Sequence, residues 1–444
     1  MKIHLIAIGG SAMHNMALAL HKKGFEVTGS DDAIFNPSRE RLEKAGLFPE
    51  EMGWFPEKIT KDIDAIILGM HARIDNPELK KAQEIGLPIY SYPEYIYEQS
   101  KDKKRVVIGG SHGKTSITAM ILHVLHYHQI DCDYMVGAQL EGFTTMVKLT
   151  HIAPIIILEG DEYLSSPIDR RPKFHWYKPH VAVLSGIAWD HINVFPIFEN
   201  YVEQFRIFRD DVSECLIYFE EDEHLKELVK EGASCRLRGY KTHVHRIDDG
   251  VTYLKGINEE VPLAVFGDHN LQNLNAARLV CEELDVSENM FLEAMQSFKG
   301  ASKRLELVKK IQNTAVYKDF AHSPSKLKAT STAMKKQFAE RKLVACMELH
   351  TFSSLNEEFL KQYAHCMDDP DTAIVYFNPV AIAHKKLEPI TKVQVHTAFA
   401  REDLMVFTDS QKLQEYLQSL NWNCQNLLMM SSGNFDGIDL EDLL

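Results

Sequence analysis

The sequence predicts an α/β protein of three domains whose parallel sheets are covered by helices. Apolar runs of strand length alternate with helical patterns along the 444 residues. Some of these runs are almost continuous in apolar residues, as in strands that are buried on both faces. Glycine-rich or polar segments follow several strands at their carboxyl ends, which is where parallel sheets collect functional groups.

The first predicted domain, residues 1–102, begins with a β-branched strand that ends in a glycine turn. A helical pattern follows, and a second strand then ends at Asp31. The turn is a degraded form of the dinucleotide-binding pattern, and Asp31 lies where an acidic residue contacts a ribose hydroxyl. A Rossmann-like nucleotide-binding domain and a plain βαβ unit without a nucleotide both fit this pattern. Two further strands are predicted at 64–69 and 88–91.

The second predicted domain, residues 103–299, opens with an apolar strand, the segment Gly-Gly-Ser-His-Gly-Lys-Thr-Ser and a helix. Gly110 and Gly113 let backbone N–H groups and the helix N-terminus face one anion. Lys114 can then reach the β- and γ-phosphates, and the Thr115 hydroxyl can hold Mg²⁺. Ile108 replaces the first glycine of the usual spacing. The segment therefore predicts a short phosphate-binding loop for ATP, with a chance glycine turn as the alternative.

Two more buried strands are predicted at 153–158 and 181–187. Glu159 follows the first of them, and His191 follows the second. Both residues should lie at the sheet edge that carries the phosphate loop, where they could bind Mg²⁺ together with the Thr115 hydroxyl. Taken singly, a strand-end carboxylate is commonly a solvated cap, and a lone histidine is commonly structural.

Two segments complete the second predicted domain. Asn270 and Asn273 enter a helix one turn apart, and their amides could contact a purine edge or cap the helix. Residues 214–262 are interpreted as a peripheral insertion of strands without chemistry.

The third predicted domain, residues 300–444, is again α/β and Rossmann-like. Strands are predicted at 314–318, 342–347, 373–377, 405–408 and 427–431. Polar clusters follow several of these strands, although the domain has no phosphate loop of its own. We therefore expect a lid that brings a second substrate.

Composition limits the partners and the compartment. The net charge of −14 and the lack of a basic stripe argue against a nucleic-acid partner. The seven cysteines are scattered, which is typical of reduced thiols in a cytoplasmic protein. The N-terminus begins with a strand and the apolar runs are short, so neither a signal peptide nor a membrane partner is expected. We expect a cytoplasmic monomer or homodimer.

The ordered motifs resemble one family along essentially the whole chain. They are G-x-x-G-K-T at 110–115, E-G-D-E-Y at 159–163, D-H at 190–191, H-N-x-x-N at 269–273, K-R-L-E at 303–306 and D-F-A-H-S-P at 319–324. As a set they are similar to the Mur ligases, the ATP-dependent amide-forming enzymes of peptidoglycan synthesis. The resemblance implies that a muramoyl carboxylate is activated by ATP as an acyl phosphate, which an amine then attacks.

The resemblance also implies a role for each matched residue. ATP would contact Gly110, Ser111, His112, Gly113, Lys114, Thr115, Ser116, Asn270, Asn273, Arg304 and Asp319. Mg²⁺ would be held by Thr115, Glu159 and His191, and the catalytic groups would be Lys114, Glu159, His191 and Arg304. UDP-N-acetylmuramate would contact Gly9, Gly10, Ser11, Ser30 and Asp31. The acceptor would meet His322 and His350.

The acceptor separates two branches of this family. Thr351 and Ser354 stand where the alanine-adding branch has residues expected to include carboxylate-binding arginines. The segments 162–163, 304–307 and 432–438 instead resemble the branch that joins UDP-N-acetylmuramate to L-alanyl-γ-D-glutamyl-meso-diaminopimelate. Leu164 and His350 depart from that branch. The tripeptide is therefore the expected acceptor, with L-alanine as the alternative.

Rival functions come from other classes. A folylpolyglutamate-type ligase does not account for the N-terminal domain, and a nicotinamide oxidoreductase leaves Lys114, Glu159 and His191 without a role. A nucleotide sensor without catalysis would bind ATP but show no turnover with an amine and a UDP-sugar.

Overall fold

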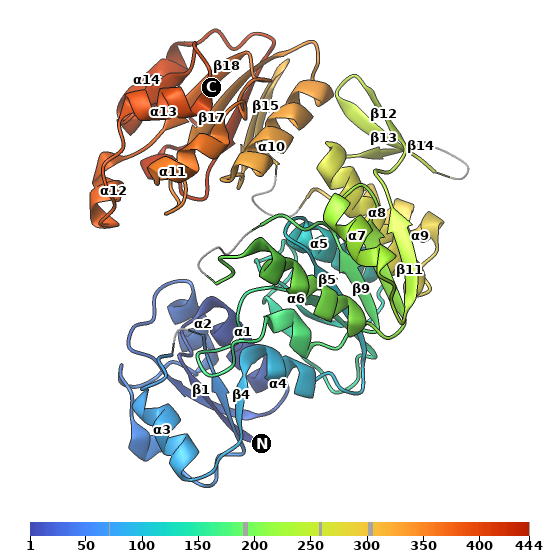
Figure 1. The fold of residues 1–444 in the computed structure, drawn as a ribbon, viewed down its shortest axis with the longest axis vertical. Coiled ribbons are helices and arrows are strands. Elements are labelled where there is room, and N and C mark those ends of the chain that lie inside the picture. The colour runs from blue at the N-terminus through green and yellow to red at the C-terminus, as the bar shows by residue number, and fades with distance from the viewer. Residues whose placement is uncertain (71, 190–193, 257–259, 301–304, 444) are drawn as a thin grey trace. The chain divides into compact units, whose positions relative to one another are not determined.

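The computed structural model describes residues 1–443 apart from 71, 190–193, 257–259 and 301–304. It contains two compact units: residues 1–241 with 272–294, and residues 242–271 with 295–444. Parallel-rich sheets with helices packed on them occur in both units (Figure 1), which confirms the predicted α/β class. The domain boundaries drawn after residues 102 and 299 stay predictions.

The N-terminal domain is built on a parallel sheet of four strands in the order β2-β1-β3-β4. Its strands are β1 (Lys2–Ile6), β2 (Glu26–Ser30), β3 (Ala65–Leu68) and β4 (Ile89–Ser91). Its helices are α1 (Ser11–Lys22), α2 (Ser38–Ala45), η1 (Pro56–Lys58), α3 (Pro77–Glu84) and α4 (Tyr92–Glu98). The predicted strand–turn–helix–strand start is therefore present, and α1 begins directly after the glycine turn.

The central sheet has the order β11-β10-β9-β5-β8-β6-β7, and only β7 runs antiparallel to its neighbour. Its strands are β5 (Lys104–Gly109), β6 (Asp133–Met135), β7 (Val147–Lys148), β8 (Ile155–Glu159), β9 (Val181–Leu184), β10 (Cys215–Phe219) and β11 (Arg236–Tyr240). Its helices are α5 (Lys114–Tyr127), η2 (Lys173–Trp176), α6 (Phe198–Asp210), α7 (Glu223–Lys230), α8 (Asp268–Glu283) and α9 (Glu288–Met295).

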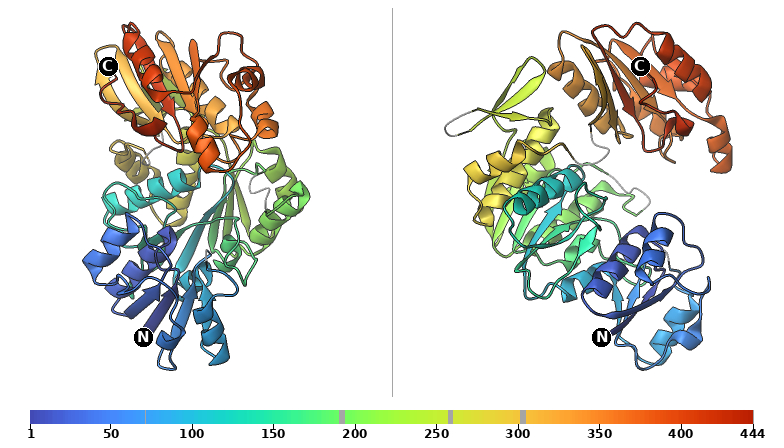
Figure 2. Two further views of the ribbon diagram at one scale, coloured as in Figure 1. Left: turned by 90° about the vertical axis from the view of Figure 1, so that its left-hand side faces the viewer. Right: turned by 180° about the vertical axis from the view of Figure 1, so that it is seen from behind.

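Strand order places the helices of this sheet on both of its faces (Figures 1 and 2). Helix α5 leads from β5 towards β6, whereas α6 leads from β9 in the opposite direction to β10. Right-handed crossovers in opposite directions put the two helices on opposite faces. The register pairs Ile108 of β5 with Glu159 of β8 and with Val183 of β9, so the three strands end at the same edge. This edge carries the predicted phosphate loop.

The interpretation of residues 214–262 as a peripheral insertion is wrong for its first half. Strand β10 pairs with β9 inside the central sheet, and Cys215, Leu216 and Ile217 are fully buried. The second half forms a separate antiparallel sheet of β12 (His245–Asp248), β13 (Val251–Lys255) and β14 (Glu260–Leu263). This small sheet belongs to the second unit, where Gln337 bonds to Thr252 and to the Gly250 carbonyl.

The main sheet of the second unit has the order β15-β16-β20-β17-β18-β19. Its strands are β15 (Glu306–Ile311), β16 (Thr314–Asp319), β17 (Lys342–Glu348), β18 (Thr372–Tyr376), β19 (Met405–Phe407) and β20 (Gln425–Met430). Its helices are α10 (Pro324–Gln337), α11 (Glu357–Leu360), η3 (Lys361–Tyr363), α12 (Pro379–His384), α13 (Lys392–Phe399), α14 (Ser410–Ser419) and η4 (Phe435–Gly437). All five predicted strands are present, and the antiparallel edge strand β15 is additional.

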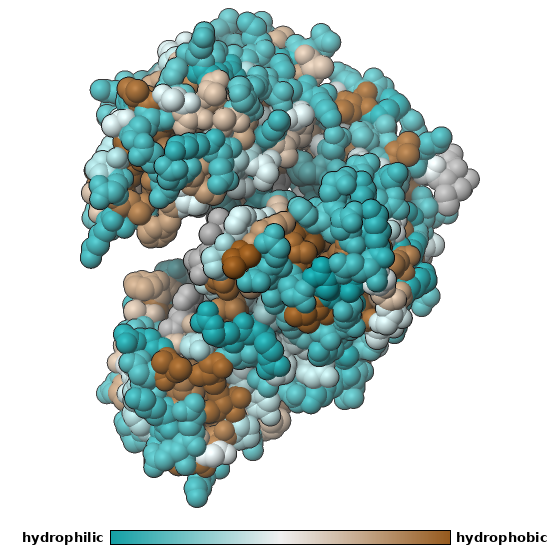
Figure 3. All heavy atoms as spheres, in the orientation of Figure 1, coloured by the Kyte–Doolittle hydropathy of each residue, from teal (hydrophilic) through white to brown (hydrophobic). Residues whose placement is uncertain are grey.

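Polar side chains dominate the face of the molecule in Figure 3, and apolar ones appear there in smaller groups. Among the described residues, none of the helices combines the length and the apolar character needed to cross a membrane.

Candidate active site

The predicted phosphate loop connects β5 to α5, and two of its glycines have backbone conformations that favour glycine. Gly110 has φ +119° and Gly113, the N-cap of α5, has φ +77°. The loop is held by the Ser111 N–H, which donates to the Gly186 carbonyl at 2.9 Å after β9. A Cβ at Gly113 would overlap the Asn273 side chain from α8. The loop therefore needs glycine for its backbone and for its close neighbours.

We expect Gly110→Ala to destabilise the protein more than Gly142→Ala. Both glycines have positive φ, but a Cβ at Gly110 would lie 2.8 Å from the Ser185 nitrogen, whereas one at Gly142 meets nothing within 4 Å. Gly142→Ala should cost only the backbone strain of about 1–3 kcal/mol, and Gly110→Ala should cost more. Urea unfolding of both variants measures the difference. Equal losses would contradict the packing assigned to the loop.

The Lys114 ammonium is held inside the loop by two acceptors. Its Nζ donates to the Gly110 carbonyl at 2.7 Å and to Glu162 Oε2 at 2.8 Å. Glu162 is only 1% exposed and also accepts from the Tyr201 hydroxyl at 2.9 Å. Burial disfavours the charge on Lys114, but Glu162 and Asp161 outweigh that effect and raise its pKa. The lysine is thus charged and positioned at the mouth of the loop.

Thr115 and Glu159 lie side by side beneath the loop. The Thr115 hydroxyl donates to Glu159 Oε1 at 2.9 Å, and the Gly137 N–H donates to Glu159 Oε2 at 2.8 Å. Burial raises the pKa of Glu159, although both hydrogen bonds act against the rise. A hydroxyl and a carboxylate fit Mg²⁺, which takes most of its other ligands from water and phosphate. His191, the third predicted ligand, lies outside the described residues, and among the described residues there is no group of three His, Cys, Asp or Glu suited to a metal.

A second lysine lies at the same sheet edge. Lys173, the first residue of η2, contacts Asp161 Oδ2 through its Nζ at 2.6 Å. Burial alone would raise the pKa of Asp161, but Lys173 and Lys114 outweigh it and hold that pKa at about 2. Asp161 lies two residues after the end of β8, so this ion pair joins the segment that follows β8 to η2.

A pocket of about 360 Å³ connects these groups to the N-terminal domain. It extends from the first turn of α1 to the end of β8, and the Asn15 side chain on α1 accepts from the Met146 N–H at 2.9 Å beside it. The lining residues are Ser11, Ala12, Tyr92, Lys114, Met135, Val136, Gly137, Met146, Val147, Glu159, Asp161, Lys173 and Tyr177. The predicted nucleotide-sugar turn and the predicted ATP loop therefore open into one pocket.

Of the predicted UDP-sugar residues, Ser11 lines this pocket, and Gly10 is the N-cap of α1. Asp31 Oδ2 instead accepts from the Gly9 N–H at 2.7 Å, so the carboxylate closes the turn within the protein. The carbonyl of the buried Ser30 accepts from the Ala7 N–H at 2.9 Å. Asp31 and Ser30 thus have structural roles here, and their contact with UDP stays a prediction.

Two more of the predicted ATP-contacting residues, Asn270 and Asp319, have partners inside the protein. Asn270 donates to the Phe266 carbonyl at 2.9 Å at the start of α8. Asp319 accepts from the Leu305 N–H and from the Ala321 N–H, both at 2.6 Å. The predicted residue Arg304 lies outside the described part of the chain.

The two predicted acceptor histidines follow β16 and β17 of the second unit, two strands that pair with opposite sides of β20. His322 Nδ1 lies 2.8 Å from the Phe320 carbonyl. His350 Nδ1 lies 3.6 Å from the buried Glu348, which also accepts from the Phe435 N–H at 2.9 Å. Their contact with an acceptor stays a prediction.

Comparison with known proteins identifies the family. Residues 2–104 match the description "Mur ligase family, catalytic domain", and residues 108–281 match "Mur ligase middle domain". A UDP-N-acetylmuramate–L-alanine ligase from Sulfurihydrogenibium sp. is 32% identical over 84% of this chain and 82% of its own length. The chain belongs to the Mur ligase family.

Solved structures share the fold of this Mur ligase along nearly its whole length. A UDP-N-acetylmuramate–alanine ligase from Thermotoga maritima has a TM-score of 0.70 at 20% identity and covers 98% of this chain and 96% of its own. A murein peptide ligase from Psychrobacter arcticus has a TM-score of 0.65 at 22% identity and covers 99% and 98%. At these identities the likeness concerns the fold, and both branches have it.

Three polar residues of this candidate site were not predicted from the sequence of this Mur ligase: Glu162, Lys173 and Tyr201. Glu162 belongs to the acidic segment after β8, which was the available signal, but it was interpreted only as a branch marker. Tyr201 connects Glu162 to the Ser111 hydroxyl, with 2.9 Å to each. Nothing in the local sequence around Tyr201 distinguishes it from a core residue of α6.

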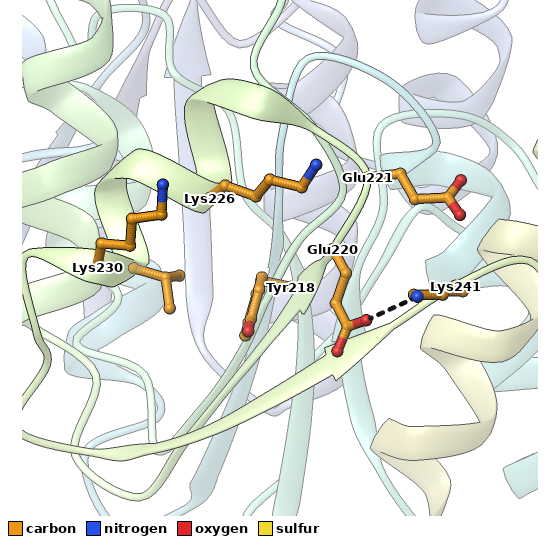
Figure 4. Close-up of a pocket in the computed structure, with 7 residues that line it drawn as sticks. Tyr218, Glu220, Glu221, Lys226, Lys230 and Lys241 are labelled. Atoms are coloured by element: carbon orange, nitrogen blue, oxygen red, sulfur yellow. Dashed lines mark ion pairs between the residues drawn. The ribbon is translucent and has the colours of Figure 1, made fainter.

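A second pocket, of about 400 Å³, lies at the ends of β10 and β11 beside α7 (Figure 4). Glu220 and Lys241 face each other across it at 3.7 Å, while Lys226 and Lys230 extend from α7. Lys226 and Lys230 pair with Glu223 and Glu227 on their own helix. Each of these lysines is solvent-exposed and already pairs with a nearby glutamate, and we assign no chemistry to this pocket.

Proposed function

We propose that this Mur ligase uses ATP to activate the carboxylate of UDP-N-acetylmuramate and joins it to the amine of L-alanine or of a peptide that begins with L-alanine. One observation carries the proposal: Lys114 and Glu159 share a single pocket with Ser11, at the turn that opens α1. A phosphate donor at the loop and an anionic sugar nucleotide at α1 would therefore bring their reacting ends together.

The chemistry proceeds in two steps. A carboxylate oxygen attacks the γ-phosphorus and the bond to ADP breaks, which gives an acyl phosphate. The amine nitrogen then attacks the acyl carbon, phosphate leaves with the electrons of the broken C–O bond, and the amine loses a proton. Lys114 would stabilise the charge that accumulates during phosphoryl transfer. Thr115 and Glu159 would hold Mg²⁺, which neutralises phosphate charge when it is bound.

The comparisons favour L-alanine as the acceptor, because the curated relative that is 32% identical over 84% of the chain is an L-alanine ligase. This favours the alternative over the tripeptide expected from sequence.

The site after β17 supports the tripeptide as a second candidate. Thr351 and Ser354 hydrogen-bond to each other there at 2.9 Å. The arginines described in the C-terminal domain, Arg341 and Arg401, are used elsewhere: Arg341 lies over the Phe338 ring, and Arg401 pairs with Asp403. A free alanine carboxylate would therefore lack a described guanidinium partner at this strand end.

ADP release separates the two acceptors. With ATP, Mg²⁺ and UDP-N-acetylmuramate present, we expect turnover to depend on the added amine, and L-alanine and L-alanyl-γ-D-glutamyl-meso-diaminopimelate are compared at equal concentrations. A higher kcat/KM with L-alanine supports the first candidate, and a higher value with the tripeptide supports the second. No amine-dependent ADP release with either acceptor would contradict the proposed function.

A further inference from the structure

The pocket between α1 and β8 has an unfavourable charge balance for an anionic substrate. Glu159 and Asp161 line the pocket, and the buried Glu162 pairs with Lys114. Three carboxylates therefore surround only two ammonium groups, those of Lys114 and Lys173. Lys114 is committed to the phosphate loop through Gly110 and Glu162. Lys173 is therefore the described lysine of the pocket that can meet a second anion.

The local structure fixes Lys173 at this position. Its backbone N–H donates to the Tyr163 carbonyl at 2.9 Å, and the Phe174 N–H donates to the Asp161 carbonyl at 3.1 Å. These bonds join η2 to the segment that follows Glu159. The Lys173 side chain is 25% exposed, and its ammonium pairs with the Asp161 carboxylate. The side chain also lines the pocket.

Tyr177, which directly follows η2, provides an independent sign of a ligand. It lines the same pocket and is fully buried. Its hydroxyl has no hydrogen-bond partner among the described residues. A buried hydroxyl without a partner is costly unless a ligand or water completes it.

We infer that Lys173 and Tyr177 bind the carboxylate of the sugar nucleotide and so select a muramoyl over a glucosaminyl substrate. The inference rests on the proposed function and adds residues for which the sequence motifs gave no role. The ammonium supplies a charge-assisted hydrogen bond, and the hydroxyl supplies a second donor. Lys114 and the metal ligands then act on the phosphate, whereas Lys173 holds the attacking carboxylate.

The test compares two sugar nucleotides that differ by the lactyl group that carries this carboxylate. UDP-N-acetylmuramate carries a lactyl carboxylate that UDP-N-acetylglucosamine lacks. Calorimetry on the full chain, with Mg²⁺ and a non-hydrolysable ATP analogue, gives the preference for the first ligand. We expect Lys173→Gln to lower that preference by about tenfold or more, as for the loss of a hydrogen bond to a charged group. Affinity for UDP-N-acetylglucosamine and for the ATP analogue should stay at the parent value.

Two further variants separate carboxylate binding from folding. Tyr177→Phe keeps the buried ring and should lower the same preference several-fold, while Lys173→Arg should restore part of it. Lys178→Gln is the matched control, because Lys178 lies on the same segment but is 51% exposed and pairs with Asp211. It should behave like the parent protein.

Each other outcome overturns the inference. A parent-like preference in Lys173→Gln, or an equal loss for both sugar nucleotides, excludes carboxylate selection by Lys173. If Lys173→Gln lowered the affinity for the ATP analogue alone, Lys173 would act at the γ-phosphate and not at the carboxylate. A parent protein that binds both sugar nucleotides equally would overturn this inference alone. The proposed function is contradicted by a different result, the lack of amine-dependent ADP release, so the two failures are distinguishable.

Discussion

Lys114→Ala is expected to reduce ADP formation about a thousandfold or more when ATP, Mg²⁺, UDP-N-acetylmuramate and the preferred amine are all present. The reason is that the Lys114 ammonium lies at the mouth of the phosphate loop, 2.7 Å from the Gly110 carbonyl, where transferred charge must be stabilised. Removal of one neutral hydrogen-bond donor to such charge typically lowers kcat about 10²–10³-fold. A lysine beside the transferred phosphate carries a full charge, so its removal should lower kcat at least as much. A coupled ADP assay measures the loss.

Stability has to be separated from catalysis in this variant. Lys114→Ala leaves Glu162, which is 1% exposed, without its ammonium partner, and an unpaired buried charge is strongly destabilising. Lys114→Ala combined with Glu162→Gln removes that penalty and should fold better while staying inactive. Lys148→Ala, at an exposed pair with Asp131, is the control for a lost surface lysine. Equal ADP rates in the double variant and the parent would refute the role given to Lys114.

Glu159→Gln is expected to lower ADP formation about a hundredfold and to shift half-maximal activity to higher Mg²⁺ concentrations. Glutamine keeps the shape of the side chain but removes the charge that would bind the cation beside the Thr115 hydroxyl, 2.9 Å away. A Mg²⁺ titration of the ADP-release rate measures both effects. Glu141→Gln, at an exposed residue of the loop after β6, serves as the control.

An unchanged Mg²⁺ dependence in Glu159→Gln would remove Glu159 from the proposed metal site. A rate loss that extra Mg²⁺ does not change, with normal ATP affinity, would point to positioning of the Gly137 backbone instead, because Glu159 also accepts from the Gly137 N–H.

Local sequence predicted the elements with strong patterns. The strand before the phosphate loop is an uninterrupted apolar run, and the glycines after it have the positive φ that the motif implies. Strand β15 was missed because Glu306–Ile311 is a charged edge strand that lacks an apolar run. Strand β10 was assigned to an insertion because the segment that follows it is rich in histidine and basic residues. Its own burial arises from pairing with β9, about thirty residues earlier in the chain, a long-range contact that the local pattern does not contain.

The order of the motifs predicted that candidate site residues of the central sheet lie at one of its edges, but it did not predict what each side chain contacts. The contact of Asp31 with a ribose stays a prediction, and the hydrogen bond that its carboxylate accepts from the Gly9 N–H was not foreseen. Lys173 was not singled out, because a lysine in a polar connection is normally solvated; only the folding of η2 against the segment after Glu159 brings it to Asp161. Tertiary contacts of this kind depend on the path of the chain between motifs.

The ion pair between Lys114 and the buried Glu162 also bears on the energetics of nucleotide binding. Because a resident carboxylate already orders the ammonium, the entropy of fixing that side chain is lost when the protein folds and not when the nucleotide arrives. In the proposed function, an incoming phosphate would share this ammonium with Glu162 or displace it, which would lower the net gain in affinity. The proposed function would therefore use a lysine that is already ordered, so that little further reorganisation of its side chain would accompany phosphoryl transfer.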